Sequence, residues 1–129
     1  MKPIRRILYL EDSKADCAIL KHALRYRDVE TVCVETVEEY QCIDQSDYDA
    51  VVFDLHVPPH TPMEVIQLVR ECELPKAVVS GSEDLKLWES VRHANALYVP
   101  KSQMQHVVET LISYLELMAN QCMDTATFA

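Results

Sequence analysis

Short apolar runs alternate along this chain with longer segments in which apolar residues recur at helical spacing. A run that is apolar at successive positions is typical of a strand buried on both faces of a sheet. The runs lie at residues 7–10, 32–34, 50–53, 77–79 and 97–99. We therefore expect five buried strands.

Each run is followed by a segment of helical period. Ser13 can cap the first helix, in which Cys17, Leu20 and Leu24 fall on one face. The other helices are expected at residues 37–43, 63–72, 85–94 and 102–119, with Asn95 placed for a left-handed C-terminal cap. The polar residues at the end of the chain are expected to be frayed.

Five strand–helix units in succession predict an α/β fold, because right-handed crossovers place helices on both faces of a parallel sheet. We expect a flavodoxin-like, doubly wound (βα)5 fold whose five-stranded parallel sheet has the order 2-1-3-4-5. A length of 129 residues suits one domain. Residues 1–120 would form that domain, and residues 121–129 a short polar tail.

Charge and hydropathy narrow the range of partners. The chain has 12 basic and 21 acidic residues, a net charge of −9, which disfavours direct binding to nucleic acid or to anionic lipid. The first apolar run ends at Glu11 and Asp12, far too early for a signal peptide or a membrane span. Any regulation of transcription would therefore act through another protein.

The cysteines indicate the compartment. The chain has five, scattered and without a C-x-x-C pair, a pattern that suggests neither a disulfide framework nor a zinc site. We expect a reducing, cytoplasmic location.

Polar residues stand where four of the strands end. The first strand is followed by Glu11 and Asp12, the third by Asp54, the fourth by Ser80, and the fifth, one residue on, by Lys101. Doubly wound sheets bind ligands at the carboxyl ends of their strands. Three carboxylates gathered there would repel one another unless a cation relieved them, which indicates a site for Mg²⁺ or Mn²⁺.

A metal beside a carboxylate, a hydroxyl and an ammonium group indicates phosphoryl transfer, which depends on positioning and charge neutralisation. Asp54 would be the nucleophile and phosphate carrier. Asp12 would bind the metal directly and Glu11 mainly through water, while Ser80 and Lys101 would bind phosphoryl oxygens.

Over essentially its whole length the chain resembles the receiver domain of bacterial two-component response regulators. The motifs that carry the resemblance are ILYLED at residues 7–12, YDAVVFDLHVP at 48–58, VVSGS at 78–82 and ALYVPK at 96–101. The resemblance implies a phosphoacceptor that takes its phosphate from a histidine kinase or a histidine phosphotransfer protein and acts on a downstream effector protein. It also allows a phosphorylation-linked homodimer.

The same resemblance assigns further roles. The main-chain carbonyl of His56 would complete the protein's share of the metal sphere. Ser80 and Tyr98 would form the switch that changes the face made by the fourth helix, fifth strand and fifth helix, while His56 and Ser82 would tune the phosphate lifetime. For Trp88, on the fourth helix, membership of that face and simple packing both stay open.

The chain departs from the family pattern directly after Lys101. The family usually has a proline there, joined by a cis peptide, whereas this chain has Ser102. A cis bond before a residue other than proline costs about 2.5 to 4 kcal/mol, so a trans bond is expected. Pro100 is unusual in a strand and fits an edge strand.

These observations favour a response regulator receiver that catalyses only its own phosphorylation and dephosphorylation and is otherwise no enzyme. The alternative is a phosphorylation-independent interaction module, a pseudo-receiver. A flavodoxin-type protein would need a neutral phosphate loop where Glu11 and Asp12 stand. A haloacid dehalogenase-type phosphatase would carry its nucleophile on the first strand, and here Asp54 follows the third.

Overall fold

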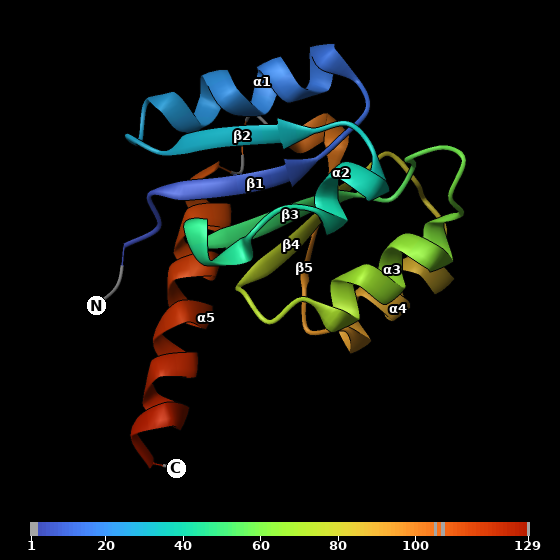
Figure 1. Cartoon of the computed structure of the whole chain (residues 1–129). Helices are drawn as coiled ribbons and strands as arrows, with labels where there is room; N and C mark the ends of the chain where they lie inside the picture. Colours follow the sequence, from blue (N-terminus) through green and yellow to red (C-terminus); the bar gives the residue numbers. More distant parts are fainter. Residues whose placement is uncertain (1–2, 105, 107, 129) are drawn as a thin grey trace.

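The computed structural model describes residues 3–104, 106 and 108–128, the side chains of the last turns of the final helix excepted. Strands and helices alternate as the hydrophobic pattern predicts (Figure 1). The strands are β1 Arg6–Leu10, β2 Glu30–Val34, β3 Ala50–Asp54, β4 Lys76–Ser80 and β5 Leu97–Pro100. The helices are α1 Lys14–Arg25, α2 Val37–Gln41, α3 Pro62–Glu71, α4 Leu85–His93 and α5 Val108–Phe128, with 3₁₀ turns at Gln45–Asp47 and Lys101–Gln103.

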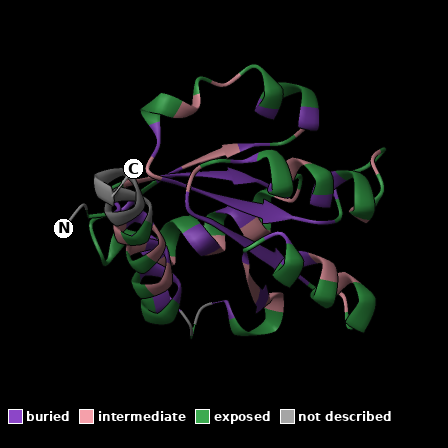
Figure 2. Cartoon of the chain, turned by 90° about the horizontal axis from the view of Figure 1, so that it is seen from below, coloured by how far each residue is buried: buried purple, intermediate pink, exposed green. Residues whose placement is uncertain are grey.

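The five strands form one sheet in the order β2-β1-β3-β4-β5, and every neighbouring pair is parallel. This confirms the predicted fold class and strand order. The three central strands are buried along almost their whole length, as Figure 2 shows for the sheet. Pro100 ends β5, an edge strand, where the loss of one backbone donor is tolerated.

Two apolar layers cover the two faces of the sheet. Successive residues of a strand point to opposite faces, so in β1 Leu8 and Leu10 join one layer while Ile7 and Tyr9 join the other. The first layer packs against α2, α3 and α4, and the second against α1 and α5. With both faces covered, the carboxyl edge of the sheet is left as the place for chemistry.

Local signals fix the starts and ends of several helices. The Ser13 hydroxyl accepts a hydrogen bond from Asp16 N at 3.2 Å and caps α1, as predicted. Thr61 and Glu64 form a reciprocal capping box at the start of α3. Asn95 has φ of 60°, the left-handed conformation expected after α4.

Two expectations about the chain end and the cysteines were wrong. The last helix begins at Val108, after a 3₁₀ turn, and continues to Phe128, whereas residues 102–119 were expected to form it. Cys17 and Cys33 form a disulfide, although the scattered cysteines suggested none. The packing of α1 on β2 brings the Cα atoms of Cys17 and Cys33 to 6.5 Å, a proximity that spacing along the chain does not reveal.

Among the described residues, no helix is long and apolar enough to cross a membrane.

Candidate functional site

Asp54 is the last residue of β3, at the carboxyl edge of the sheet. Its side chain is buried, and its Oδ1 atom has no hydrogen-bond partner among the described residues. Leaving a buried polar atom unpaired is costly, so natural proteins pair nearly all of them. This unpaired oxygen therefore marks a position suited to an incoming cation or reacting group.

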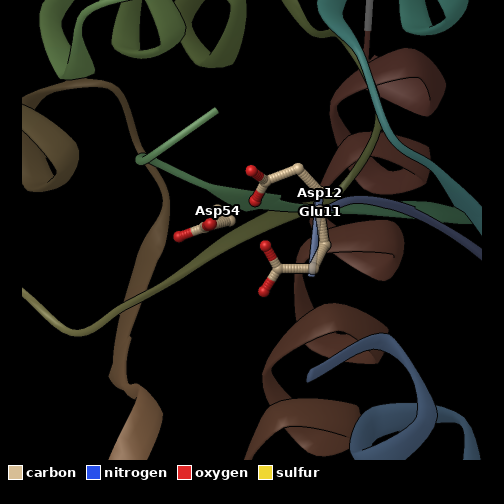
Figure 3. Close-up of side chains that lie close together, drawn as sticks. All are labelled: Glu11, Asp12 and Asp54. Carbon is tan, nitrogen blue, oxygen red and sulfur yellow. The ribbon is translucent and has the colours of Figure 1, made fainter. Parts of the chain in front are cut away.

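Two more carboxylates lie beside Asp54. Glu11 and Asp12 directly follow β1, which pairs with β3 in the sheet, and one carboxylate oxygen from each of the three residues lies within 4.8 Å of the others (Figure 3). Glu11 is buried and Asp12 is exposed, so the cluster opens to solvent on the Asp12 side. Carboxylate oxygens are ligands for hard divalent cations, and the cluster can bind a metal as predicted.

Glu11 shows how crowded the cluster is. The pKa of Glu11 is raised to about 8: burial is the largest cause, a hydrogen bond shared with the Asp54 carboxyl acts in the same direction, and Lys101 opposes both. The Tyr9 hydroxyl donates to Glu11 Oε1 at 3.3 Å, and its own pKa is raised by burial and by the Glu11 charge. A neighbouring cation would relieve this repulsion between carboxylates.

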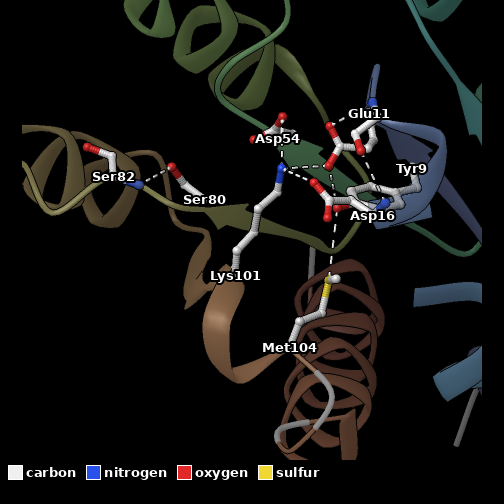
Figure 4. A network of polar contacts seen from close by, with 9 residues as sticks. Tyr9, Glu11, Asp16, Asp54, Ser80, Ser82, Lys101 and Met104 are labelled. Carbon is white, nitrogen blue, oxygen red and sulfur yellow. Dashed lines mark hydrogen bonds and ion pairs between the residues drawn. The ribbon is translucent and has the colours of Figure 1, made fainter. Parts of the chain in front are cut away.

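Lys101 brings a positive charge into the cluster from the turn after β5. Its Nζ lies 2.7 Å from Glu11 Oε1, 2.8 Å from Asp16 Oδ2 and 3.4 Å from Asp54 Oδ2 (Figure 4). Burial by itself lowers the pKa of Lys101, but the hydrogen bonds to Asp16 and Glu11 outweigh it and raise that pKa. The hydrogen bond from Lys101 lowers the pKa of Asp16. The ammonium group therefore stays charged.

Ser80 ends β4 beside the acidic cluster and is buried. Its hydroxyl oxygen accepts a hydrogen bond from Ser82 N at 3.1 Å. A Cβ added at Gly81, the next residue, would meet no atom within 4 Å, so the side of Gly81 where a side chain would stand is open. The five residues predicted from the strand ends, Glu11, Asp12, Asp54, Ser80 and Lys101, therefore lie at one edge of the sheet.

The carbonyl oxygen of Ser82 connects this edge to the face beside β5. It accepts hydrogen bonds from the Tyr98 hydroxyl at 2.8 Å and from Trp88 Nε1 at 3.0 Å. The Trp88 and Tyr98 rings lie in contact, with centroids 4.7 Å apart. Trp88 therefore donates a hydrogen bond to Ser82 and contacts the ring of Tyr98, so its role is more than packing.

The remaining predicted positions lie around the rim. The His56 side chain is exposed, while its neighbours Leu55 and Val57 are buried. The Ser82 hydroxyl accepts from Asp84 N at 3.1 Å, at the cap of α4. The Lys101–Ser102 peptide is trans, as predicted, and the cis bond among the described residues joins Pro58 and Pro59.

Sequence comparison gives no relative, whereas comparison of folds gives many. No protein-family model matches the chain, and no curated protein matches it. The receiver domain of HemR from Leptospira biflexa superposes with a TM-score of 0.71 at 22% identity, over 87% of this chain and 95% of that one. A response regulator receiver protein from Burkholderia phymatum gives 0.71 at 18% identity, over 89% and 96%.

The chain has the fold of response regulator receiver domains. A third structure with this receiver fold, the response regulator Rcp1 in an Mn²⁺-bound form, gives a TM-score of 0.68 at 17% identity, over 84% of this chain and 94% of that one. At these sequence identities the similarity supports a shared fold alone. The roles of individual residues must therefore be argued from the site itself.

The motifs of the receiver fold missed one residue of this site and one contact between residues that they did indicate. Asp16 lies in the first turn of α1 and binds Lys101, and its position four residues after Asp12 was the available signal. The hydrogen bond between Trp88 and Ser82 joins residues in a loop and a helix, and no pattern in the sequence indicates it.

Proposed function

We propose that this chain is a phosphorylation-dependent receiver module whose phosphoacceptor is Asp54. The observation that carries the proposal is the setting of the Asp54 carboxylate. It is buried, one oxygen is unpaired among the described residues, two acids lie within 4.8 Å, and a lysine ammonium lies 3.4 Å away. This combination suits a nucleophile that receives a dianionic group, because positioning and charge neutralisation dominate phosphoryl transfer.

In the transfer, an Asp54 oxygen forms a bond to phosphorus while the bond from phosphorus to the donor breaks, and the donor leaves with the electron pair. Lys101 and the Ser80 hydroxyl would bind the phosphoryl oxygens. The donor would be a histidine kinase or a histidine phosphotransfer protein. The chain would catalyse only this reaction and the later hydrolysis of its own aspartyl phosphate.

A divalent cation, Mg²⁺ or Mn²⁺, fits the three carboxylates, since hard cations take oxygen ligands. Asp12, Asp54 and the main-chain carbonyl of His56 would hold it directly, and Glu11 mainly through water. When bound, the cation would neutralise charge on the phosphoryl oxygens. The Mn²⁺-bound form of Rcp1, a protein of the same fold, supports this choice of ion.

The output surface would be the face formed by α4, β5 and α5. A groove of about 550 Å³ lies there, lined by apolar, aromatic and two charged side chains: Leu85, Trp88, Glu89, Arg92, Ala96, Leu97, Tyr98 and Tyr114. Movement of Ser80 toward a phosphoryl group would disturb its bond from Ser82 N and, through the Ser82 carbonyl, the positions of Tyr98 and Trp88. An effector protein, or a second copy of the chain, would bind this face differently in the two states.

The proposed donors place the module in the cytoplasm. Thiols there would reduce the Cys17–Cys33 disulfide, so that only a fraction of the molecules would carry it. The net charge of −9 argues against nucleic acid or an anionic membrane surface as the direct target.

The deciding experiment is incubation with acetyl phosphate and Mg²⁺, followed by intact mass measurement. The wild type should gain one phosphoryl group and lose it again with time once acetyl phosphate is removed, while Asp54→Asn should gain none. An unchanged mass for the wild type would instead support the phosphorylation-independent interaction module. An equal gain on Asp54→Asn would move the acceptor elsewhere.

His56 and Ser82 would set how long the phosphate stays, since His56 is exposed two residues after the acceptor. A histidine there can hydrogen-bond water or the phosphoryl group. Autodephosphorylation of the wild type, His56→Ala and Ser82→Ala should be compared across pH. Identical rates and slopes would remove both residues from this role.

A further inference from the structure

The shortest contacts of Lys101 are not with the proposed phosphoacceptor, Asp54. Its ammonium nitrogen lies 2.7 Å from Glu11 and 2.8 Å from Asp16, but 3.4 Å from Asp54. An N–H···O hydrogen bond normally spans about 2.7–3.2 Å, so the contact to Asp54 is the loosest of the three. Figure 4 shows the ammonium drawn between these carboxylates.

Asp16 is held in place by the start of α1. Its backbone N–H donates to the Ser13 hydroxyl at 3.2 Å, which fixes the first turn of the helix. Its carboxylate accepts the hydrogen bond from Lys101 Nζ at 2.8 Å. Residues 85 positions apart are thus joined across the site.

An ammonium group has three N–H donors, and three carboxylates surround this one. A phosphoryl group on Asp54 would bring further acceptor oxygens to the same nitrogen. The donor that faces Asp54 can pass to one of these oxygens, but a second bond to the phosphoryl group requires Lys101 to release Glu11 or Asp16. The partner released should be the carboxylate that water can most easily solvate in place of the lysine.

Exposure distinguishes the two stronger partners. The Glu11 side chain is 0% exposed and also takes a hydrogen bond from Tyr9, so release would leave a buried carboxyl group without the lysine and out of reach of water. The Asp16 side chain is 30% exposed, so water can take the place of the lysine. Release of Asp16 is therefore the less costly exchange.

We propose that Asp16 is a positioning residue that holds Lys101 in the unphosphorylated protein and competes with the phosphoryl oxygens for its ammonium group. This rests on the proposed function of Asp54. In the transfer from acetyl phosphate, an Asp54 oxygen bonds to phosphorus, the bond from phosphorus to the acetate oxygen breaks, and acetate leaves with the electron pair. Lys101 passes from Asp16 to a phosphoryl oxygen, and no proton needs to move.

The first test is the rate of phosphorylation by acetyl phosphate with Mg²⁺, followed by intact mass. Asp16→Asn keeps the size of the side chain but removes the competing charge, and should react roughly fivefold faster, the scale of one partly exposed ion pair. Asp16→Glu keeps a carboxylate and should stay near the wild-type rate. Glu35→Gln removes one exposed charge near the same site without an ion pair to Lys101 among the described residues, and should also stay near it.

The second test reads the Lys101 ammonium directly, by NMR of the ¹⁵N-labelled protein without phosphate or divalent cation. Asp16→Asn should shift the Nζ resonance and speed the exchange of its protons with water, and Asp16→Glu should largely preserve both. A rate for Asp16→Asn equal to or below that of the wild type would overturn the competition. An unchanged Nζ resonance would overturn the holding contact.

The two proposals fail in different ways. If the wild type takes up no phosphoryl group, the function proposed for Asp54 fails and the competition fails with it, while the Nζ resonance still decides whether Asp16 holds Lys101. If the wild type is phosphorylated but Asp16→Asn reacts no faster, the function of Asp54 stands and the role of Asp16 is rejected.

Discussion

The Tyr98 hydroxyl and the Trp88 indole donate to the same acceptor, the carbonyl oxygen of Ser82, at 2.8 and 3.0 Å. Ser82 in turn donates its backbone N–H to the Ser80 hydroxyl. One residue of the β4–α4 loop therefore connects the carboxyl edge of the sheet with two aromatic rings beside β5.

Tyr98→Phe should lower the free energy of unfolding by about 1 kcal/mol or less, because it removes one neutral hydrogen bond while Trp88 still satisfies the carbonyl. Urea unfolding followed by circular dichroism would measure the change. Tyr114→Phe is the matched control, since its hydroxyl makes a longer bond of 3.5 Å to the Asn95 carbonyl. A larger loss for Tyr114→Phe than for Tyr98→Phe would contradict the assignment.

Phosphorylation should alter the fluorescence of Trp88, which is the single tryptophan of the chain and contacts Tyr98. A displaced Tyr98 would change both the ring contact and the hydrogen bonding of the indole. Emission should be recorded during incubation with acetyl phosphate and Mg²⁺. Asp54→Asn should show no change, and an identical change in that variant would assign the signal to the ions alone.

Mg²⁺ should stabilise the folded protein, because the clustered carboxylates of Glu11, Asp12 and Asp54 bind it only in the folded state. At ten times its dissociation constant, the ion should raise the free energy of unfolding by about 1.4 kcal/mol. Urea unfolding with and without Mg²⁺ would show this. Asp12→Asn should lose most of the effect and Glu35→Gln should keep it; equal stabilisation of all three proteins would rule out the cluster as the site.

His60 should make stability depend on pH. Its ring lies 3.2 Å from Glu38 of α2 and 3.4 Å from Glu64 of α3, and these bonds, Glu38 first, raise the pKa of His60 above its ordinary 6.5. The stabilisation is then fully present below the unfolded pKa and lost as pH rises through the higher folded value. The difference in free energy of unfolding between wild type and His60→Asn should therefore shrink as the pH rises through that value.

NMR titration of the His60 ring would test the cause of this pH dependence. Replacing both partners, in Glu38→Gln/Glu64→Gln, should return the pKa of His60 toward its ordinary value. A wild-type ring that titrates at or below 6.5 would contradict the prediction.

Reduction of Cys17–Cys33 should destabilise the protein, because the bond closes a loop with a sequence separation of 16 residues. Closing a loop of this length lowers the entropy of the unfolded chain and so stabilises the folded protein by about 3 kcal/mol. Urea unfolding with and without dithiothreitol would measure the loss, and Cys17→Ser/Cys33→Ser should reproduce it without reductant. Cys42→Ser changes an exposed free cysteine and should have little effect.

The residues at the strand ends were predictable because a parallel sheet gathers the ends of its strands at one edge. Asp54 and Lys101 lie far apart in sequence, yet the strand order alone brings them together. Contacts between a helix and a strand are different. The positions of Asp16 and Cys17 depend on how α1 is rotated and packed, which hydrophobic periodicity defines only to within a face.

The C-terminal helix illustrates a second limit. Its apolar positions predicted a helix, but its start depends on the turn at Lys101–Gln103 and its end on a segment with no strong stop signal. The trans peptide after Lys101 was predictable from local chemistry, since cis bonds are costly without proline.

Tyr98 and Lys101 lie three residues apart on β5 and the turn that follows it. A protein that shifted this short segment on binding would move the lysine as well as the aromatic ring. Linkage then requires influence in both directions: a partner that prefers the phosphorylated state must favour that state by the same factor by which phosphorylation tightens its own binding. Under the proposed function, the abundance of an effector would therefore help to set how much of this protein carries phosphate.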